Sequence, residues 1–336
     1  MTFEFAEIFR KNLRSWFKTN ARILPWRTEP NLYKTIVSEF MLQQTQVKTV
    51  LPFFEKWIER FPNFATLAEA TSDEVIHYWA GLGYYSRAKN LHSLAKHIVK
   101  HPVSHAEDLL QYKGIGHYTA AAIASIAFND PIVVIDGNVI RVLARTFNHT
   151  EIFISKDAAI KWCTPFAQEL LDKDNPGKFN EAIMELGALV CTKNNPKCSA
   201  CPLKGLCLSL KNNTINLCPQ FIQPKRTKQI KKRLWLYKNK QILLEKSNIG
   251  NLLELPELTD ERSPLGNDCR LIFSGKRSIS TTNYTEEIYA PLTPNDFPLR
   301  APSFSICKFY PITDLDKLSL SGPHKRWIKN LLKEGL

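Results

Sequence analysis

The chain has few acidic residues and lacks long apolar stretches and internal repeats. Its 336 residues include 32 Asp and Glu against 45 Lys and Arg, which gives a formal net charge of +13. The longest apolar stretch, near residues 120–128, is too short to span a membrane. Glu4 and Glu7 interrupt the first segment, whose apolar residues recur at helical spacing, so we expect an amphipathic helix there and no signal peptide. We therefore expect a globular protein with no membrane partner.

The excess of basic residues favours a polyanionic partner. Lys and Arg side chains neutralise phosphates and release the counterions that surround a nucleic acid. Composition leaves a second interpretation open, namely charge that only keeps the protein in solution. With 44% hydrophobic residues the chain can form packed cores, and its length indicates two domains of ordinary size.

Four of the eight cysteines lie close together, at Cys191, Cys198, Cys201 and Cys207. Only the middle pair has the short spacing of a zinc knuckle, whereas zinc sites usually combine two such knuckles. Four thiolates in one compact loop are typical of a cubane 4Fe–4S cluster. We predict one 4Fe–4S cluster held by the loop 191–207, with a zinc site or unrelated thiols as the alternatives.

The remaining cysteines are scattered and are expected to be ordinary thiols: Cys163, Cys218, Cys269 and Cys307. Apart from the metal loop, free thiols of this kind indicate a reducing compartment. Since no targeting signal is seen, we expect a cytoplasmic, nucleoid-associated protein if the source is prokaryotic.

The composition and the apolar spacing of the sequence change along the chain. Helical apolar spacing dominates residues 1–210, in segments separated by Gly, Pro or Asn that include 47–61, 72–79, 86–100 and 157–171. Residues 211–232 are polar and basic with two prolines, which is the composition of a linker. Short apolar runs in residues 233–336 predict strands of a smaller α+β domain, closed by a helix near 323–332.

Two glycines, Gly114 and Gly116, precede an Ala-rich helical segment in QYKGIGHYTAAAIA, residues 111–124. Glycine permits a sharp turn and a close approach of the backbone to a ligand. Amides at the start of the following helix can then bind a phosphate. A tight turn between two packed helices is the alternative interpretation.

Residues 112–123, YKGIGHYTAAAI, resemble the helix–hairpin–helix motif of DNA glycosylases. Residues 133–145, VVIDGNVIRVLAR, resemble the catalytic Gly/Pro–Asp segment of the same superfamily, and the cysteine loop resembles the iron–sulfur loop of its endonuclease III and MutY branches. The resemblance covers most of residues 20–210. It implies a mainly α helix–hairpin–helix glycosylase fold with an iron–sulfur loop.

Three further segments resemble the MutY-type adenine DNA glycosylase family: LPWR at 24–27, SEFMLQQTQV at 38–47 and GLGYYSRAKNLH at 81–92. In the strand-cutting endonuclease III branch a lysine follows the hairpin and attacks the sugar. Tyr118 stands at that place here. The resemblance therefore implies a monofunctional enzyme that removes a base with water and leaves the strand intact.

The resemblance assigns the catalytic acid to Glu39 and the carboxylate that stabilises the oxocarbenium-like sugar to Asp136. Glu39 lies in a largely apolar segment, where burial would raise the pKa of its carboxyl group, although a solvated helix charge is the alternative. Asp136 is also a favoured helix N-cap residue. Asn138 and Tyr118 correspond to the residues that position Asp136 and the water.

The substrate base has to be flipped out of the duplex, and a wedge has to fill the gap. Gln44 and Tyr84 match the family's wedge residues, although Tyr84 taken alone reads equally as a core aromatic. Trp26 and Arg27 resemble part of the adenine pocket. The resemblance also implies that the backbone amides of Gly114 and Gly116 bind a phosphate.

In this family the second domain is Nudix-like and recognises 8-oxoguanine opposite adenine. Residues 248–258, NIGNLLELPEL, resemble one of its segments without the two tryptophans, and no Nudix catalytic box is present. The family's Phe-Ser-His loop falls near residues 278–284, where Ser280 matches the serine and the histidine is absent. The missing histidine puts lesion discrimination in doubt more than the chemistry.

The expected function is removal of adenine opposite 8-oxoguanine or guanine in double-stranded DNA, by a monomer with one 4Fe–4S cluster. The cluster is expected to act as scaffold, with Lys193, Lys197 and Lys204 near the DNA backbone. Two alternatives remain: a related glycosylase acting on a mismatched or oxidised pyrimidine, and a non-catalytic binder of lesion DNA.

Overall fold

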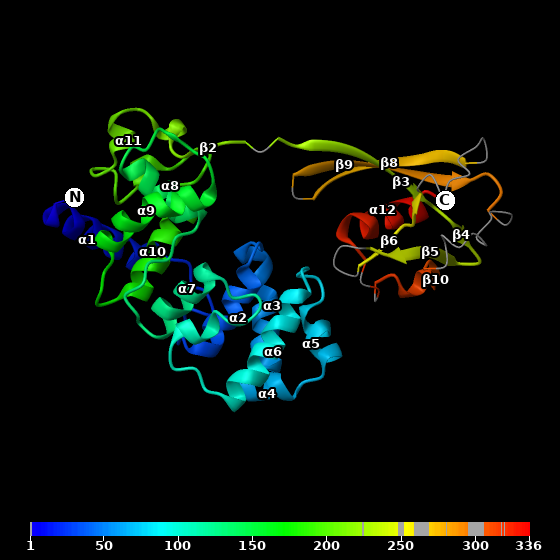
Figure 1. Ribbon diagram of the computed structural model, residues 1–336, viewed down its shortest axis with the longest axis horizontal. Helices are drawn as coiled ribbons and strands as arrows, with labels where there is room; N and C mark the ends of the chain where they lie inside the picture. The colour runs from blue at the N-terminus through cyan, green and yellow to red at the C-terminus, as the bar shows by residue number, and fades with distance from the viewer. Residues whose placement is uncertain are drawn as a thin grey trace. The chain divides into compact units, whose positions relative to one another are not determined.

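The computed structural model divides into two compact units, residues 1–222 and 223–336 (Figure 1). It describes residues 2–223, 225–247, 252–258, 269–279, 281–294, 306–316, 318 and 320–336. The first unit is mainly helical and the second contains sheets and a closing helix, as predicted. No helix in the described ranges is long and apolar enough to cross a membrane.

The first unit contains two separate hydrophobic cores. One is formed by consecutive helices and is rich in fully buried aromatic side chains such as Phe54, Trp57 and Trp79. Its elements, which run from blue to cyan in Figure 1, are α2 (Leu32–Leu42), α3 (Val47–Arg60), α4 (Phe64–Glu69), α5 (Ser72–Trp79), α6 (Ser86–Lys100), η1 (Ala106–Leu109) and α7 (His117–Ala127).

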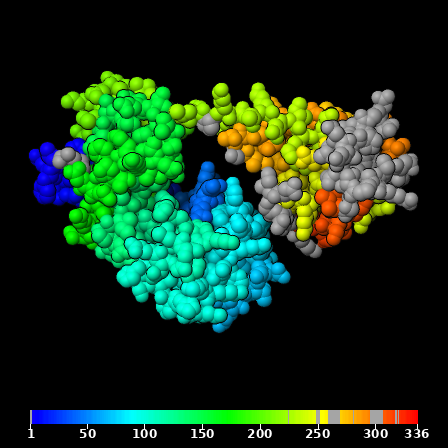
Figure 2. Space-filling model, in the orientation of Figure 1, coloured from blue at the N-terminus to red at the C-terminus, as the bar shows by residue number. Residues whose placement is uncertain are grey.

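The second core joins the first helix of the chain to helices far along the sequence. It is built from α1 (Phe3–Asn20), α8 (Gly137–Thr146), α9 (Lys156–Leu170) and α10 (Pro176–Leu189). Figure 2 shows this grouping on the surface, where the blue N-terminal residues lie against the green segments. A parallel pair of short strands, β1 (Ile152–Phe153) and β2 (Gln220–Phe221), adjoins it. The first unit therefore has two lobes, each with its own core.

Local sequence signals account for the helix boundaries. Side-chain oxygens at the N-cap accept a backbone N–H of the first turn, which satisfies donors that would otherwise have no partner. The predicted helices at 47–61, 72–79, 86–100 and 157–171 correspond to α3, α5, α6 and α9. The residues that cap helices of the first unit in this way include Thr2, Asn31, Asn63, Thr71, Asp136 and Ser155.

The boundary between the two units lies inside the predicted linker, residues 211–232, although this segment also contains secondary structure. Much of it is occupied by η3 (Ile215–Leu217), by β2 and by the start of β3 (Thr227–Leu234). The first four residues of β3 are exposed, so this strand begins with the polar composition of a linker. The boundary between the units lies at Ile222 and Gln223.

The described part of the second unit contains two small sheets and a helix of 12 residues. One sheet has the strand order β7-β3-β9-β8, in which β3 and β9 are parallel. Besides β3, its strands are β7 (Glu257–Leu258), β9 (Thr282–Pro291) and β8 (Cys269–Ile279). The other has the order β10-β5-β4, from β10 (Lys308–Pro311), β5 (Gln241–Lys246) and β4 (Tyr237–Lys238), with β6 (Leu253–Glu254) paired to β5. The helix α12 (Gly322–Lys333) packs Trp327, Ile328 and Leu331 into the core. The predicted α+β character is confirmed.

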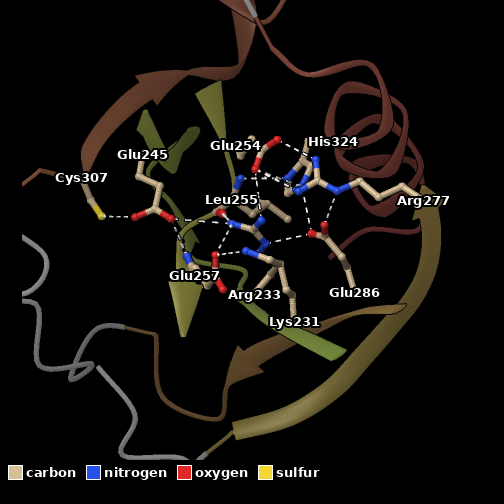
Figure 3. A network of polar contacts seen from close by, with 10 residues as sticks. All are labelled: Lys231, Arg233, Glu245, Glu254, Leu255, Glu257, Arg277, Glu286, Cys307 and His324. Atoms are coloured by element: carbon tan, nitrogen blue, oxygen red, sulfur yellow. Dashed lines mark hydrogen bonds and ion pairs between the residues drawn. The ribbon is translucent and has the colours of Figure 1, made fainter. Parts of the chain in front are cut away.

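A buried network of charged side chains connects the strands of the second unit (Figure 3). Its centre is Arg233 on β3, whose Nε donates to Glu286 at 2.8 Å and whose Nη2 donates to Glu254 at 3.0 Å. Arg277 on β8 binds both of these carboxylates. Burying any one of these charges without a partner would be costly. The ion pairs therefore hold β3, β6, β8 and β9 in one arrangement.

His324 on α12 completes this network. Its Nδ1 accepts the backbone N–H of Leu255 at 2.9 Å, and its Nε2 lies 3.1 Å from Glu286 Oε2. A neutral ring with Nδ1 as acceptor carries its proton on Nε2, from which it donates to the Glu286 carboxylate. Burial lowers the pKa of His324, in agreement with this neutral form. Nothing in the sequence pattern predicts this network.

Candidate active site

The predicted catalytic residues come together between the two cores of the first unit. Glu39 on α2 and Asp136 at the start of α8 line one cavity of about 230 Å³, together with Tyr118 and Asn138. An outer groove of about 720 Å³ shares Glu39, Tyr118 and Asp136. It is also lined by Gln44, Gly114, Gly116 and Lys156. The two lobes therefore contribute one carboxyl group each to a common site.

Glu39 is buried, with 8% of its surface exposed. Seven neighbouring residues of α2 are buried as well, because most of this helix packs inside the first core. Burial, together with the charges of Asp136 and Glu181, raises the pKa of Glu39 to about 7. A carboxyl group of this kind carries a proton near neutral pH and can act as a general acid.

Asp136 is held by three hydrogen bonds at the N-terminus of α8. Its Oδ1 accepts the backbone N–H groups of Asn138 and Val139, both at 2.8 Å, and its Oδ2 accepts Asn138 Nδ2 at 2.8 Å. The helix-cap interpretation of Asp136 is therefore correct. The same bonds fix a carboxylate in the cavity beside Glu39, so the capping role and the proposed catalytic role are compatible.

Asn138 is itself held from behind. Its Oδ1 accepts from Arg141 Nη2 at 2.8 Å, and the same guanidinium donates to Gly187 O at 2.8 Å and to Cys191 O at 2.6 Å. Arg141 thus connects the start of the cysteine loop to the residue that orients Asp136. A short chain of contacts leads from that loop to the cavity.

Tyr118 lies at the start of α7 and lines both the cavity and the groove. Its hydroxyl donates to Met184 Sδ at 3.5 Å. Burial, with the charges of Glu39 and Asp136, raises the pKa of Tyr118, so the phenol stays neutral. Lys156 is the one lysine in the lining described for the cavity and the groove, and it lies at the first turn of α9.

The cavity has a charged wall that the sequence did not predict. Glu185 on α10 accepts from Arg22 Nε at 2.7 Å and Nη2 at 2.8 Å, and from Arg27 Nη2 at 3.1 Å. Burial alone would raise the pKa of Glu185, but the hydrogen bonds from Arg22 and the charge of Arg27 outweigh it and hold that pKa at about 2. This carboxylate is therefore ionised and anchors both arginines.

Glu181, one helical turn before Glu185, lines the same cavity. It binds Arg27 Nε at 3.1 Å and Lys178 Nζ at 3.0 Å. Glu181 and Glu185 are four residues apart on one face of α10. The spacing of two acids in a largely apolar helix is the sequence signal for this pair, although only the fold places them beside Arg27.

Trp26 and Arg27 both line the cavity, as predicted. The Trp26 ring is buried and packs edge-on against Phe54 at 5.1 Å between centroids. The Arg27 guanidinium lies 5.4 Å from the centre of the Phe17 ring. Trp26 is thus held by packing, and Arg27 both by packing and by the ion pairs of the charged wall.

The two predicted wedge residues lie at the surface of the first lobe. Gln44 has φ 56° and Tyr84 has φ 51°, so both adopt the left-handed conformation that is uncommon outside glycine. Tyr84 is 61% exposed, which excludes the core-aromatic interpretation. Gln44 lines the outer groove, whose described lining does not include Tyr84.

The glycine hairpin forms one wall of the outer groove. Gly114 has φ 94°, and a Cβ there would stand 2.9 Å from the Phe40 ring. Gln43 Nε2 donates to Gly114 O at 2.8 Å and fixes the hairpin beside α2. Gly116 is the N-cap of α7, and no side chain caps this helix. The amides at its start therefore face the groove without an internal cap.

The four cysteines of the loop line one small cavity, which contains no carboxylate or imidazole. All four are free thiols, and Arg145 Nη1 lies 3.4 Å from Cys191 Sγ. No group of three or more His, Cys, Asp or Glu in the described ranges is arranged to hold a single metal ion. A donor set of sulfur alone, with an adjacent cation, fits an iron–sulfur cluster better than an oxygen-preferring ion.

The predicted lesion-reading residue Ser280 lies outside the described residues. The described residues nearest to it in the paired strands β8 and β9 are Ile279 and Thr282, which pair with each other. In the described part of this hairpin, Ser278 Oγ lies 2.7 Å from Asn283 Oδ1. Of the segment 248–258, the structure describes Leu252 to Leu258, which supplies Glu254 and Glu257.

Comparisons with known proteins agree on the family. Residues 37–164 match the model of the HhH-GPD superfamily base excision DNA repair protein. An adenine DNA glycosylase of Buchnera aphidicola is 40% identical over 258 residues, which cover 72% of this chain and 71% of that one. The human adenine DNA glycosylase is 44% identical over 223 residues, and the alignment covers 61% of this chain and 40% of that longer protein.

Two solved structures share the fold of the first unit. A thermostable thymine-DNA glycosylase has a TM-score of 0.56 at 23% identity, over 62% of this chain and 98% of that one. An endonuclease III–DNA complex has a TM-score of 0.52 at 18% identity, over 63% of this chain and 98% of that one. The chain therefore belongs to the adenine DNA glycosylase family, within the HhH-GPD superfamily of base excision DNA repair proteins.

Proposed function

We propose that this glycosylase removes adenine opposite 8-oxoguanine or guanine in double-stranded DNA by hydrolysis, without cutting the strand. One observation carries the proposal: two carboxyl groups from different lobes line one cavity, and the pKa of one of them, Glu39, is about 7. Such a pair supplies both a proton donor and an anion to the same bond.

The proposed reaction uses each group once. The protonated Glu39 gives its proton to N7 of the flipped adenine, so the base leaves neutral instead of as an anion. The Asp136 carboxylate, fixed by Asn138, stabilises the positive charge that develops on the sugar. Water then adds its oxygen to the anomeric carbon of the sugar and releases one proton to the solvent, which completes the hydrolysis. Tyr118 stands where a strand-cutting relative has its nucleophilic lysine.

The charged wall suits recognition of a purine. Trp26 offers an apolar ring, while Arg27 and Glu181 offer donors and acceptors already held in place by ion pairs. Polar groups that are fixed before the substrate arrives discriminate strongly, since a base that leaves them unpaired loses their hydrogen bonds. We infer that the edge of adenine is read by this wall.

The four thiolates of Cys191, Cys198, Cys201 and Cys207 are proposed to hold one 4Fe–4S cluster. When bound, the cluster supplies a fixed framework for the loop. Excision of the base depends instead on a proton donor and on electrostatic stabilisation of the developing charge. The residues of this chain that connect the loop to the site are Arg145 and Arg141. Their role is to hold the loop and Asn138 in register.

The second unit is proposed to read the base opposite the adenine, through the β8–β9 hairpin and Ser280. The missing histidine in that loop leads us to expect a smaller preference for 8-oxoguanine over guanine than a complete Phe-Ser-His loop gives. We propose that the protein acts as a monomer.

Single-turnover release of adenine tests the proposal. The full chain with its cluster is mixed with duplexes that carry 8-oxoguanine:adenine or guanine:adenine pairs. Strand breaks at the adenine should appear only after alkali treatment, and Glu39→Gln should abolish them. Strand cutting without alkali contradicts the monofunctional assignment. Release of thymine or an oxidised pyrimidine, with no release of adenine, favours the pyrimidine alternative, and tight binding with no product favours a non-catalytic binder.

A further inference from the structure

Arg87 on α6 contacts both backbone segments that carry the wedge residues. Its side chain is buried, with only 6% of the residue exposed. The two terminal nitrogens approach five backbone carbonyls: Nη1 those of Phe40 at 3.1 Å, Met41 at 2.9 Å and Gln43 at 2.5 Å, and Nη2 those of Leu82 at 3.3 Å and Gly83 at 3.2 Å. One guanidinium therefore joins the end of α2 to the loop before α6.

Two of these carbonyls belong to the peptide bonds that lead directly into the wedge residues. The Gln43 carbonyl precedes Gln44, and the Gly83 carbonyl precedes Tyr84. Left-handed backbone at a non-glycine residue costs on the order of 1 kcal/mol or more and persists only where the surroundings fix it. The Arg87 guanidinium is a group that fixes both positions.

The ring of Tyr84 is also held by Arg87. The guanidinium carbon lies 5.2 Å from the centre of the Tyr84 ring and 5.4 Å from the centre of the Trp79 ring. Trp79 Nε1 donates to Gly83 O at 3.0 Å, and the backbone N–H of Arg87 donates to Tyr84 O at 2.9 Å. The inner side of Tyr84 is thus anchored while most of its surface stays open to a partner.

We propose that Arg87 is a positioning residue that fixes Gln44 and Tyr84 as one preorganised wedge for base flipping. The proposal rests on the proposed function, because a wedge is needed only if a base is extruded. Extrusion costs a few kcal/mol of stacking and pairing, and a wedge ordered in advance adds no further ordering cost on binding. Arg87 is not among the residues that line the cavity or the groove, so its effect reaches the reaction through the wedge.

The substitution Arg87→Lys tests the proposal, because lysine keeps the charge but lacks the planar fork of donors. Adenine release is measured in single turnover on two duplexes that place adenine opposite 8-oxoguanine or opposite an abasic analogue. The second duplex has no partner base to separate from the adenine. We expect a loss of roughly 10- to 100-fold on the paired duplex, as for a misplacement of about 1 Å, and a loss under about 3-fold on the unpaired one. Lys96→Ala, on the exposed face of the same helix, is the control and should change neither rate.

A second readout follows flipping directly. With 2-aminopurine in place of the adenine, the fluorescence rise on binding should be reduced in Arg87→Lys. The double variant Arg87→Lys with Tyr84→Ala should lose little more than the larger single loss, because both changes affect one unit.

Equal losses on both duplexes, or losses that multiply in the double variant, overturn the proposal. A wild-type protein that releases no adenine from either duplex contradicts the proposed function instead, while the fluorescence still tests Arg87. If Arg87→Lys does not fold, Trp79→Phe removes the hydrogen bond to Gly83 O from the same assembly. It should lower the rate on the paired duplex alone, and an equal fall on both duplexes again overturns the proposal.

Discussion

Gly187 on α10 lies so close to Asn138 that a Cβ added at residue 187 would stand 2.5 Å from the Asn138 Cβ. Glycine is therefore required here for space, since real side chains do not approach to this distance. Asn138 holds Oδ2 of Asp136, so the packing of α10 on α8 determines the orientation of the Asp136 carboxylate.

Gly187→Ala should lower adenine release by roughly 10- to 100-fold, because a displaced Asn138 misaligns Asp136 by a fraction of an ångström to about 1 Å. The single-turnover rate is the measurement. Gly322→Ala is the control, since nothing lies within 4 Å of a Cβ at that position. A Gly187→Ala variant with wild-type kinetics would show that Asn138 does not set the geometry of Asp136.

The rate of adenine release should fall as the pH rises through about 7, because the acid form of Glu39 has its pKa there. Glu181→Gln removes one of the charges that raise this pKa, so the fall should move to lower pH. The pH dependence of the single-turnover rate checks both statements. Glu7→Gln, at an exposed position of α1, should leave the pH profile unchanged.

Glu39→Gln should stabilise the protein at alkaline pH while abolishing activity. The pKa of Glu39 rises from 4.5 to about 7 on folding, so the folded state binds more protons and stability declines between these values as pH rises. Above pH 7 the full cost is present, about 3 kcal/mol in order of magnitude. Thermal melting at pH 8 should favour the variant, and at pH 4 the two proteins should melt alike. A variant less stable than wild type at pH 8 contradicts this account.

Glu286→Gln should lower the free energy of unfolding of the second unit by about 3–5 kcal/mol, because it breaks a buried ion pair. Although burial opposes it, hydrogen bonding from His324 and the arginine charges hold the pKa of Glu286 at about 2. This stabilisation is present above the unfolded pKa near 4.5 and is lost as the pH falls toward 2. The second unit of the wild-type protein should therefore loosen as the pH is lowered toward 2. Amide exchange of β9 measures both effects, and Glu287→Gln serves as the neighbouring control, with a cost under about 1 kcal/mol.

Local patterns were sufficient for part of the site. Glu39, Asp136, Tyr118 and Asn138 lie in short motifs, and all four line the expected cavity. Helix bounds also followed from apolar spacing, since the periodicity of a packed helix is written into consecutive residues. The chemical roles of these four residues stay predictions.

What the sequence did not predict depends on contacts between distant segments. Arg22 binds Glu185 although 163 positions separate them in the sequence, because α1 and α10 pack in the same core. The network around Arg233 draws its members from separate strands and from α12, and only Glu254, Leu255 and Glu257 stand in a segment that the sequence analysis singled out. The exposed start of β3 was not predicted as a strand for another reason, since a solvent-facing strand and a linker have the same composition.

The order of the two cores along the chain has a consequence for synthesis. The first core is continuous, from Leu24 to Ala124, whereas the second needs both Ala6 and residues as late as Leu203. A nascent chain can therefore complete the lobe that carries Glu39 while α1 still waits for its partners, since domains fold as their contacts emerge. Chains arrested beyond the first unit, after residue 222, should resist a protease pulse throughout, whereas chains arrested after α7 should resist it only beyond α1. Glu39 and Asp136 would then come together only after the lobe that carries Glu39 has already folded.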